Sequence, residues 1–225
     1  MVLAAGNRTS KADQALAELC QIYWAPLYTY LRKKGHQPAE ADDIVQGFLT
    51  RLIEKSALAA ADPNRGRFRS FLISSLQNFV ANQRDHKLAQ KRGGNQKKFS
   101  LDFSAAEEAY HREPWTGLTP EKIFDRRWAL DLLNLVLAQL QNEYTQGGKA
   151  ELFKKLSPSL TGAAQAAAYA QIAQELEITC DAVKMAASRL RKRYREILRR
   201  AIADTVASPD EVDDEIRHLF QAISG

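Results

Sequence analysis

The sequence predicts an all-α protein made of two small helical domains joined by a linker, the C-terminal one a helix-turn-helix. Apolar residues recur every three or four positions over most of the 225 residues, which is the period of an amphipathic helix. No stretch alternates apolar and polar residues as a half-buried strand does, and no internal repeat is present. Proline and glycine fall between the periodic stretches, where helices begin and end.

The first domain, residues 1–94, is expected to hold three helices. The first helix covers about residues 11–34 and ends at Gly35, and Pro26 should kink or split it because proline removes a backbone donor. Its apolar stripe consists of Leu16, Leu19, Tyr23, Trp24, Leu27 and Leu31.

The second helix opens at Pro38, where the missing N–H of proline costs nothing. Its predicted buried stripe consists of Ala41, Ile44, Val45, Phe48, Leu49, Leu52 and Ile53. The opposite, polar face carries Glu40, Asp43, Gln46, Gly47 and Thr50. Taken alone, such a face is explained better by solvation than by a partner.

The third helix begins at Phe68, after the turn-rich loop 61–67. Its stripe consists of Phe68, Phe71, Leu72, Leu76, Phe79 and Val80. It continues through the polar, basic residues 82–92 and stops at Gly93-Gly94. Residues 95–118 lack a clear period and are expected to form the linker.

The second domain, residues 119–203, starts with Thr119 as a helix cap and Pro120 as the first helical residue. The stripe of this helix consists of Ile123, Phe124, Trp128, Leu132, Leu135, Val136 and Leu140. Glycines 147–148 and residues 157–162 interrupt the helical pattern that follows.

Residues 169–200 have the pattern of a helix-turn-helix. A short helix over 169–176 is followed by the turn 177–179, in which Ile178 should pin the turn to the core, although Glu177 stands where a glycine is common. Thr179 should cap the second helix, which runs from Thr179 to Arg200. That helix should bury Val183, Ala187, Leu190, Tyr194 and Ile197. An ordinary helical hairpin with a basic surface would show the same spacing.

The basic residues of this second helix indicate DNA as a partner. Residues 184–200 contain eight Lys or Arg and one acid, and residues 84–98 contain six Lys or Arg and one acid. The net charge of the whole chain is +5. Two separate basic blocks favour a polyanion contacted in two places, although a solvated face explains either block alone. The candidates for base contacts are Lys184, Ser188 and Arg189. The candidates for phosphate contacts are Arg191, Lys192, Arg193 and Arg195.

The C-terminal residues 204–225 should form a separate acidic, amphipathic helix. Ser208 to Glu211 has the form of a capping box, and six acids fall between residues 204 and 215. The apolar stripe consists of Val212, Ile216, Leu219, Phe220 and Ile223. We expect it to pack on its own domain or, in a regulatory role, to cover a basic DNA-binding surface.

Three stretches, in this order, resemble bacterial RNA polymerase sigma factors of the compact extracytoplasmic-function type. Residues 39–49 are similar to the helix that binds core polymerase. Residues 68–78, which end in Asn, are similar to the segment that melts the promoter, and residues 169–194 to the module that reads the −35 element. Phe71 replaces a common Trp of that family, and Gln77 replaces a common Arg. These two differences leave undetermined which bases of the −10 element the chain would read.

The resemblance implies two partners, core RNA polymerase and promoter DNA, and an anti-sigma factor is a further partner that it allows. Core polymerase would contact Glu40, Asp43, Gln46 and Thr50. The −10 element would contact Asn64, Arg65, Arg67, Asn78, Asn82, Arg84, Lys87, Lys91 and Arg92, and Arg69 could line the same groove for the single strand. The competing interpretations are a stand-alone helix-turn-helix regulator and a helical adaptor that binds no nucleic acid.

No catalytic site is expected. The four histidines share no metal-ligand spacing with acids or cysteines, and Gly93-Gly94 is not part of a phosphate-binding loop. Cys20 and Cys180 lie far apart, and no apolar run or leader suggests a membrane or secretion. We therefore expect a cytoplasmic non-enzyme that needs no cofactor or metal and binds no membrane.

Overall fold

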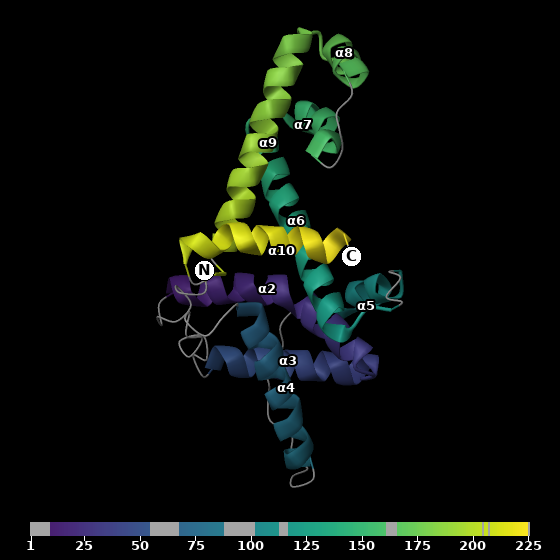
Figure 1. The fold of residues 1–225 in the computed structure, drawn as a ribbon, viewed down its shortest axis with the longest axis vertical. Coiled ribbons are helices and arrows are strands. Elements are labelled where there is room, and N and C mark those ends of the chain that lie inside the picture. The colour runs from purple at the N-terminus through teal and green to yellow at the C-terminus, as the bar shows by residue number, and fades with distance from the viewer. Residues whose placement is uncertain are drawn as a thin grey trace. The chain divides into compact units, whose positions relative to one another are not determined.

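The computed structural model describes residues 10–54, 68–87, 102–112, 117–160, 166–203, 205–206 and 208–224. Every regular element in these ranges is a helix, which confirms the predicted all-α class (Figure 1). None of these helices combines the length and the apolar character that crossing a membrane requires. The chain divides into two compact units, one formed by residues 1–131 and 202–225 and the other by residues 132–201.

Helix α2 (Ser10–Lys33) opens the first unit and continues through Pro26, so the proline does not split it in two. Its neighbours Ala25, Leu27 and Tyr28 are buried, so packing on both sides of the proline compensates for the hydrogen bond that is lost. The helix ends at Gly35, whose φ of 94° lets the N–H of His36 donate to the carbonyl of Leu31 at 3.1 Å.

Helix α3 (Pro38–Glu54) packs against both α2 and α4 (Phe68–Lys87), and it buries its predicted stripe from Ala41 to Leu52. The predicted polar face is narrower than expected, because Gly47 and Thr50 are also buried. Two packing neighbours require a wider buried face than one. The Oγ1 of Thr50 donates to the carbonyl of Gln46 at 2.8 Å.

Helix α5 (Phe103–Arg112) lies within the segment that the sequence suggested as a linker. It is attached to α2 by Glu107, which accepts two hydrogen bonds of 2.8 Å from Arg32 and one of 2.7 Å from Tyr28. The ring of Phe103 also meets Trp24, with centroids 5.1 Å apart. Apolar periodicity missed α5 because much of its attachment is polar.

Helix α6 (Pro120–Gln146) begins as predicted, with the N–H of Lys122 bound to Thr119 Oγ1 at 3.3 Å. Six of its seven predicted stripe residues are buried: Ile123, Phe124, Trp128, Leu132, Val136 and Leu140. Leu135 is 46% exposed, so its assignment to the stripe was wrong. Residues 135 and 136 fit the spacing equally well, and Val136 occupies the buried position.

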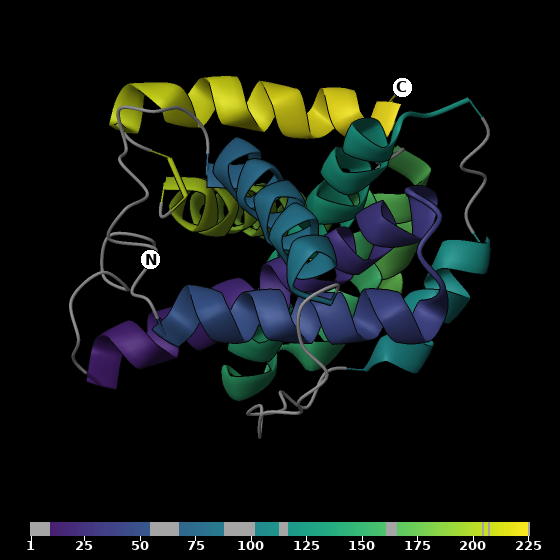
Figure 2. The same ribbon diagram turned by 90° about the horizontal axis from the view of Figure 1, so that it is seen from below.

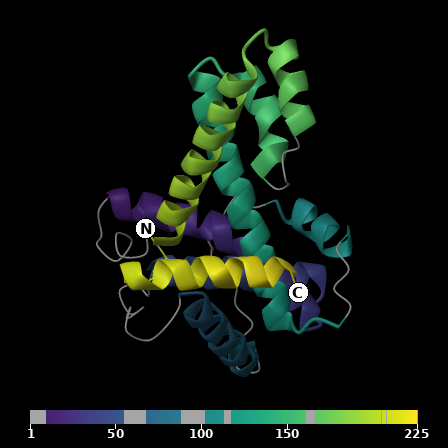
Figure 3. The same ribbon diagram turned by 45° about the horizontal axis from the view of Figure 1, so that its top comes forward.

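The second unit contains α7 (Ala150–Leu156), the 3-10 turn η2 (Ser157–Leu160), α8 (Ala166–Glu175) and most of α9 (Cys180–Ala203). Figure 3 shows α8 beside the N-terminal end of α9. The limits of the two units fall inside α6 and α9.

After α9, the turn η3 (Pro209–Glu211) leads into α10 (Val212–Ser224), which belongs to the first unit. Helix α10 buries Val212, Glu215 and Leu219, whereas Phe220, predicted to be in the stripe, is 51% exposed. Figure 2 shows α10, in yellow, beside the first turns of α4. Helix α10 also contacts the first half of α6, where His218 lies 3.1 Å from Asp125 and Arg126 donates to the carbonyl of Ile223 at 3.3 Å.

Arg69, near the start of α4, makes the main polar contact with α10. Its Nε and Nη2 donate to the two carboxylate oxygens of Glu215 at 2.7 and 3.0 Å, and its Nη1 donates to Asp125 of α6. The guanidinium also lies 4.2 Å from the ring of Trp128. Arg69 and Glu215 are 4% and 3% exposed. The expectation that Arg69 lines a groove for single-stranded DNA is therefore wrong.

Candidate nucleic-acid interface

The turn between α8 and α9 is closed by backbone hydrogen bonds. The N–H of Ile178 donates to the carbonyl of Ala173 at 3.0 Å, across Glu177, whose φ is 53°. Glutamate thus occupies the left-handed position that favours glycine. Thr179 caps α9 as predicted, since Ala182 N–H donates to its Oγ1 at 3.2 Å. Ile178 is 40% exposed, so the expectation that its side chain pins the turn was wrong.

Helix α9 separates an apolar face from a basic one. Val183, Ala187, Leu190 and Ile197 are buried as predicted, and Tyr194 is only partly buried. The opposite side exposes what we call the α9 basic face, formed by Lys184, Ser188, Arg189, Lys192 and Arg195. Because the first turns of such a helix enter the major groove, this face presents donors that suit DNA.

Arg191 differs from its neighbours because its guanidinium is directed toward the rest of the second unit. It donates to the hydroxyl of Tyr169 at 2.7 Å and to the carbonyl of Ser159 at 3.4 Å. It therefore joins α9 to α8 and η2. Spacing placed Arg191 among the phosphate contacts, and nothing in the sequence marks Tyr169 as its partner.

Arg193 is exposed but paired with carboxylates. It donates to both oxygens of Glu143 on α6 at 2.8 Å, and to Glu196 at 3.2 Å. The hydrogen bonds to Glu143 and then to Glu196 raise the pKa of Arg193 above its usual value. Of the predicted phosphate contacts, Lys192 and Arg195 are therefore better placed than Arg193.

Lys184 pairs with Asp181 at 3.0 Å, and both side chains are well exposed. The hydrogen bond to Asp181 raises the pKa of Lys184. Exposed pairs of this kind contribute little free energy because solvent screens them. Lys184 can therefore exchange Asp181 for a nucleic-acid oxygen at small cost.

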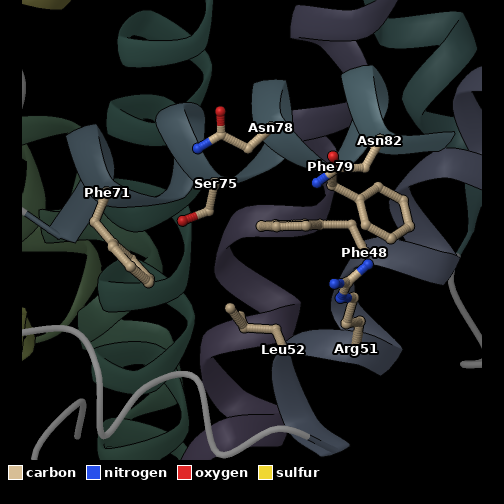
Figure 4. Close-up of a pocket in the computed structure, with 8 residues that line it drawn as sticks. All are labelled: Phe48, Arg51, Leu52, Phe71, Ser75, Asn78, Phe79 and Asn82. Atoms are coloured by element: carbon tan, nitrogen blue, oxygen red, sulfur yellow. The ribbon is translucent and has the colours of Figure 1, made fainter. Parts of the chain in front are cut away.

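A second candidate surface is a groove between α3 and α4 with a volume of about 200 Å³ (Figure 4). Its lining combines aromatic rings with amides, a hydroxyl and a guanidinium: Phe48, Arg51, Leu52, Phe71, Ser75, Asn78, Phe79 and Asn82. The rings of Phe48 and Phe79 have centroids 5.8 Å apart, and the Arg51 guanidinium lies 5.9 Å from the Phe79 ring.

Asn78 and Asn82, two predicted −10 contacts, lie one helical turn apart on this groove and are exposed. The sequence did not suggest Arg51, whose position one turn after Phe48 is the signal that could have indicated it. Arg84 and Lys87 belong to the last turns of α4. Asn64, Arg65, Arg67, Lys91 and Arg92 lie outside the described residues.

The predicted polymerase contacts on α3 are exposed to different degrees. Glu40 and Asp43 are exposed, and Glu40 pairs with His36 Nδ1 at 3.1 Å. Gln46 is half-buried and its Nε2 donates to Asp42 at 2.7 Å. Thr50 is 8% exposed, so it is a poor candidate for contact with a partner.

Among the described residues, no group of His, Cys, Asp and Glu has the arrangement of a metal site. Comparisons with models of protein families, with curated proteins and with solved structures find no match.

Proposed function

We propose that this chain is a dissociable subunit of bacterial RNA polymerase, a sigma factor of the extracytoplasmic-function type that directs initiation at specific promoters. The observation that carries this proposal is the α9 basic face, which follows a capped turn and exposes Ser188, Arg189, Lys192 and Arg195 in the second unit. In the proposed function this module reads the −35 element as duplex DNA.

The groove between α3 and α4 supports a second contact, with an unstacked base of the −10 element. Aromatic side chains offer surfaces on which a base can stack, and an Asn amide can bind both N6 and N7 of adenine. The partly exposed rings of Phe71 and Phe79, together with Asn78 and Asn82, supply both kinds of group in about 200 Å³. Such a pocket offsets the cost of removing a base from the stack.

The acidic end of α3 is the proposed site for core polymerase. Glu40 and Asp43 are exposed there, in the stretch that resembles the polymerase-binding helix of sigma factors. A stand-alone regulator would use the α8–α9 module alone and would need neither this surface nor the groove. Dependence on core polymerase therefore separates the two functions.

Run-off transcription with purified core polymerase and a library of genomic fragments tests the proposal. We expect the chain to produce transcripts from a small set of fragments that core polymerase alone does not transcribe. The double variant Arg189→Ala/Lys192→Ala should lose them, whereas Arg112→Ala, which removes an exposed arginine of α5, should retain them. Absence of any chain-dependent transcript would contradict the proposal.

A further inference from the structure

Met185 is a large apolar side chain on the exposed side of α9. It is 54% exposed, in the second turn after the Thr179 cap. In a helix, residues three and four positions apart are neighbours on the surface. Of these neighbours of Met185, Asp181, Ser188 and Arg189 are exposed and polar, and Ala182 is half-buried. Met185 is thus an apolar group within a polar, basic surface.

The first turns of a DNA-reading helix are the part that reaches base edges. In the major groove, hydrogen-bonding groups distinguish most base pairs, but thymine also presents its C5 methyl group, which is read by apolar contact. Methionine suits such a contact because its unbranched thioether chain adapts to the position of a small apolar group. Phosphates and other base edges offer Met185 no comparable partner.

We propose that Met185 is a specificity-determining residue that reads the methyl group of one thymine, next to the base contacted by Arg189. This inference rests on the proposed function of α9 as a reader of duplex DNA. It adds the class of base pair that the first turns of α9 prefer, an A·T pair with its thymine methyl directed at Met185.

The test uses the full chain with core polymerase and a promoter selected from random duplex DNA. Each thymine of the −35 half is replaced in turn by deoxyuridine, which removes only the methyl group. At one position we expect the wild-type complex to bind about four-fold more weakly, the loss that corresponds to one buried methyl group. The other thymines should give no such loss.

Variants of Met185, combined with the deoxyuridine substitutions, form a double-mutant cycle that tests the same contact from the protein side. Met185→Ala should bind thymine DNA several-fold more weakly and should then show no further loss with deoxyuridine at that position. Met185→Leu should keep the sensitivity to the methyl group. The matched control is Leu135→Ala, which truncates an apolar side chain of α6 that is 46% exposed, and it should bind as the wild type does.

Two results would overturn the inference: a wild-type complex that is indifferent to deoxyuridine at every thymine, or a Met185→Ala variant that keeps full sensitivity to it. If Met185→Ala weakened only the association with core polymerase, Met185 would face a protein and the inference would also fail. In each of these cases promoter-dependent transcription still occurs, so the proposed function stands. Failure to select any promoter would contradict the proposed function itself.

Discussion

Arg69 and Arg189 show two uses of arginine in the same chain. Arg69, near the start of α4, is buried, donates to two carboxylates and lies over Trp128. Arg189, on α9, is exposed in a row of basic and hydroxyl side chains. Burial opposes the charge of Arg69, but its hydrogen bonds to Glu215 and the charge of Asp125 outweigh this effect and raise the pKa of Arg69.

The difference shows why a basic residue in a segment proposed to bind DNA is not in itself evidence of a DNA contact. Arg69 and Arg189 are equally basic in the sequence, yet Arg69 is paired with an acid 146 residues away. Removing one member of a buried ion pair leaves the other charge buried without a partner, which is costly. Removing an exposed arginine costs little stability, because water solvates the charge that remains. Mutation of Arg69 should therefore lower the stability of the protein, whereas mutation of Arg189 should lower its affinity for DNA.

The largest expected effect is that of Arg69→Met. It leaves Glu215 buried without its partner and should lower the free energy of unfolding by about 3–5 kcal/mol. Urea denaturation of the full chain measures this loss. The double variant Arg69→Met/Glu215→Leu should recover part of it, since no buried Glu215 charge then remains.

The control for this prediction is Arg112→Ala, which breaks an exposed pair with Glu108 on α5 and should cost less than about 0.5 kcal/mol. Equal losses for Arg69→Met and Arg112→Ala would remove the distinction between the two classes of arginine.

Two arginines of α9 sharpen the comparison within one helix. Arg189→Ala should weaken specific promoter binding by up to about 3 kcal/mol and leave stability nearly unchanged. Arg191→Ala should instead lower stability by about 1 kcal/mol, because Tyr169 and Ser159 lose their hydrogen-bond partner. Promoter titration and urea denaturation of both variants check this, and the reverse pattern would contradict the assigned orientations.

The Arg32–Glu107 pair is an intermediate case, partly buried between α2 and α5. Hydrogen bonds from Arg32 lower the pKa of Glu107 from 4.5 to about 2, against an opposing effect of burial. This contribution to stability is complete above pH 4.5 and is lost as the pH falls toward 2. We expect about 2 kcal/mol to be lost, after allowance for solvent screening.

Glu107→Gln tests this pH dependence. The difference in unfolding free energy between the wild type and the variant should be largest near neutral pH and should shrink below pH 4.5, as Glu107 itself becomes protonated. A difference that stayed constant down to pH 2 would show that the charge of Glu107 does not attach α5 to α2.

The smallest expected effect is at the turn before α9. Glu177→Gly should stabilise the second unit by roughly 0.5–1 kcal/mol, because glycine adopts the positive φ of this position without strain. Thermal unfolding measures the gain, and Glu177→Ala serves as the control, since alanine has the same backbone preference as glutamate. A loss of stability with glycine would argue against the left-handed turn.

Periodicity predicted the helices with apolar faces and their caps. The buried stripe of α3, the caps Thr119 and Thr179, and the two faces of α9 follow from local residue order, which the sequence displays directly. The contacts between distant polar residues could not be predicted in this way. The pair of Arg32 and Glu107 joins residues 75 positions apart, and the pair of Arg69 and Glu215 joins residues 146 positions apart. No local pattern in the sequence marks such partners.

The candidate site was predictable to a similar degree. Spacing identified the outward positions of α9, and the resemblance to sigma factors indicated the amides of Asn78 and Asn82 on α4. It did not distinguish Arg191 or Arg193, which pair within the second unit, from Lys192 and Arg195. It also missed Arg51, because the groove forms only when α3 and α4 are packed together.

Association with core RNA polymerase tests the central claim most directly. Purified chain and core polymerase should elute together as an equimolar complex in size-exclusion chromatography. Asp43→Lys on the exposed end of α3 should weaken this complex, whereas Asp210→Lys, at another exposed acid, in η3, should not. The absence of any complex, in a preparation that binds a DNA site by itself, would contradict the sigma-factor account.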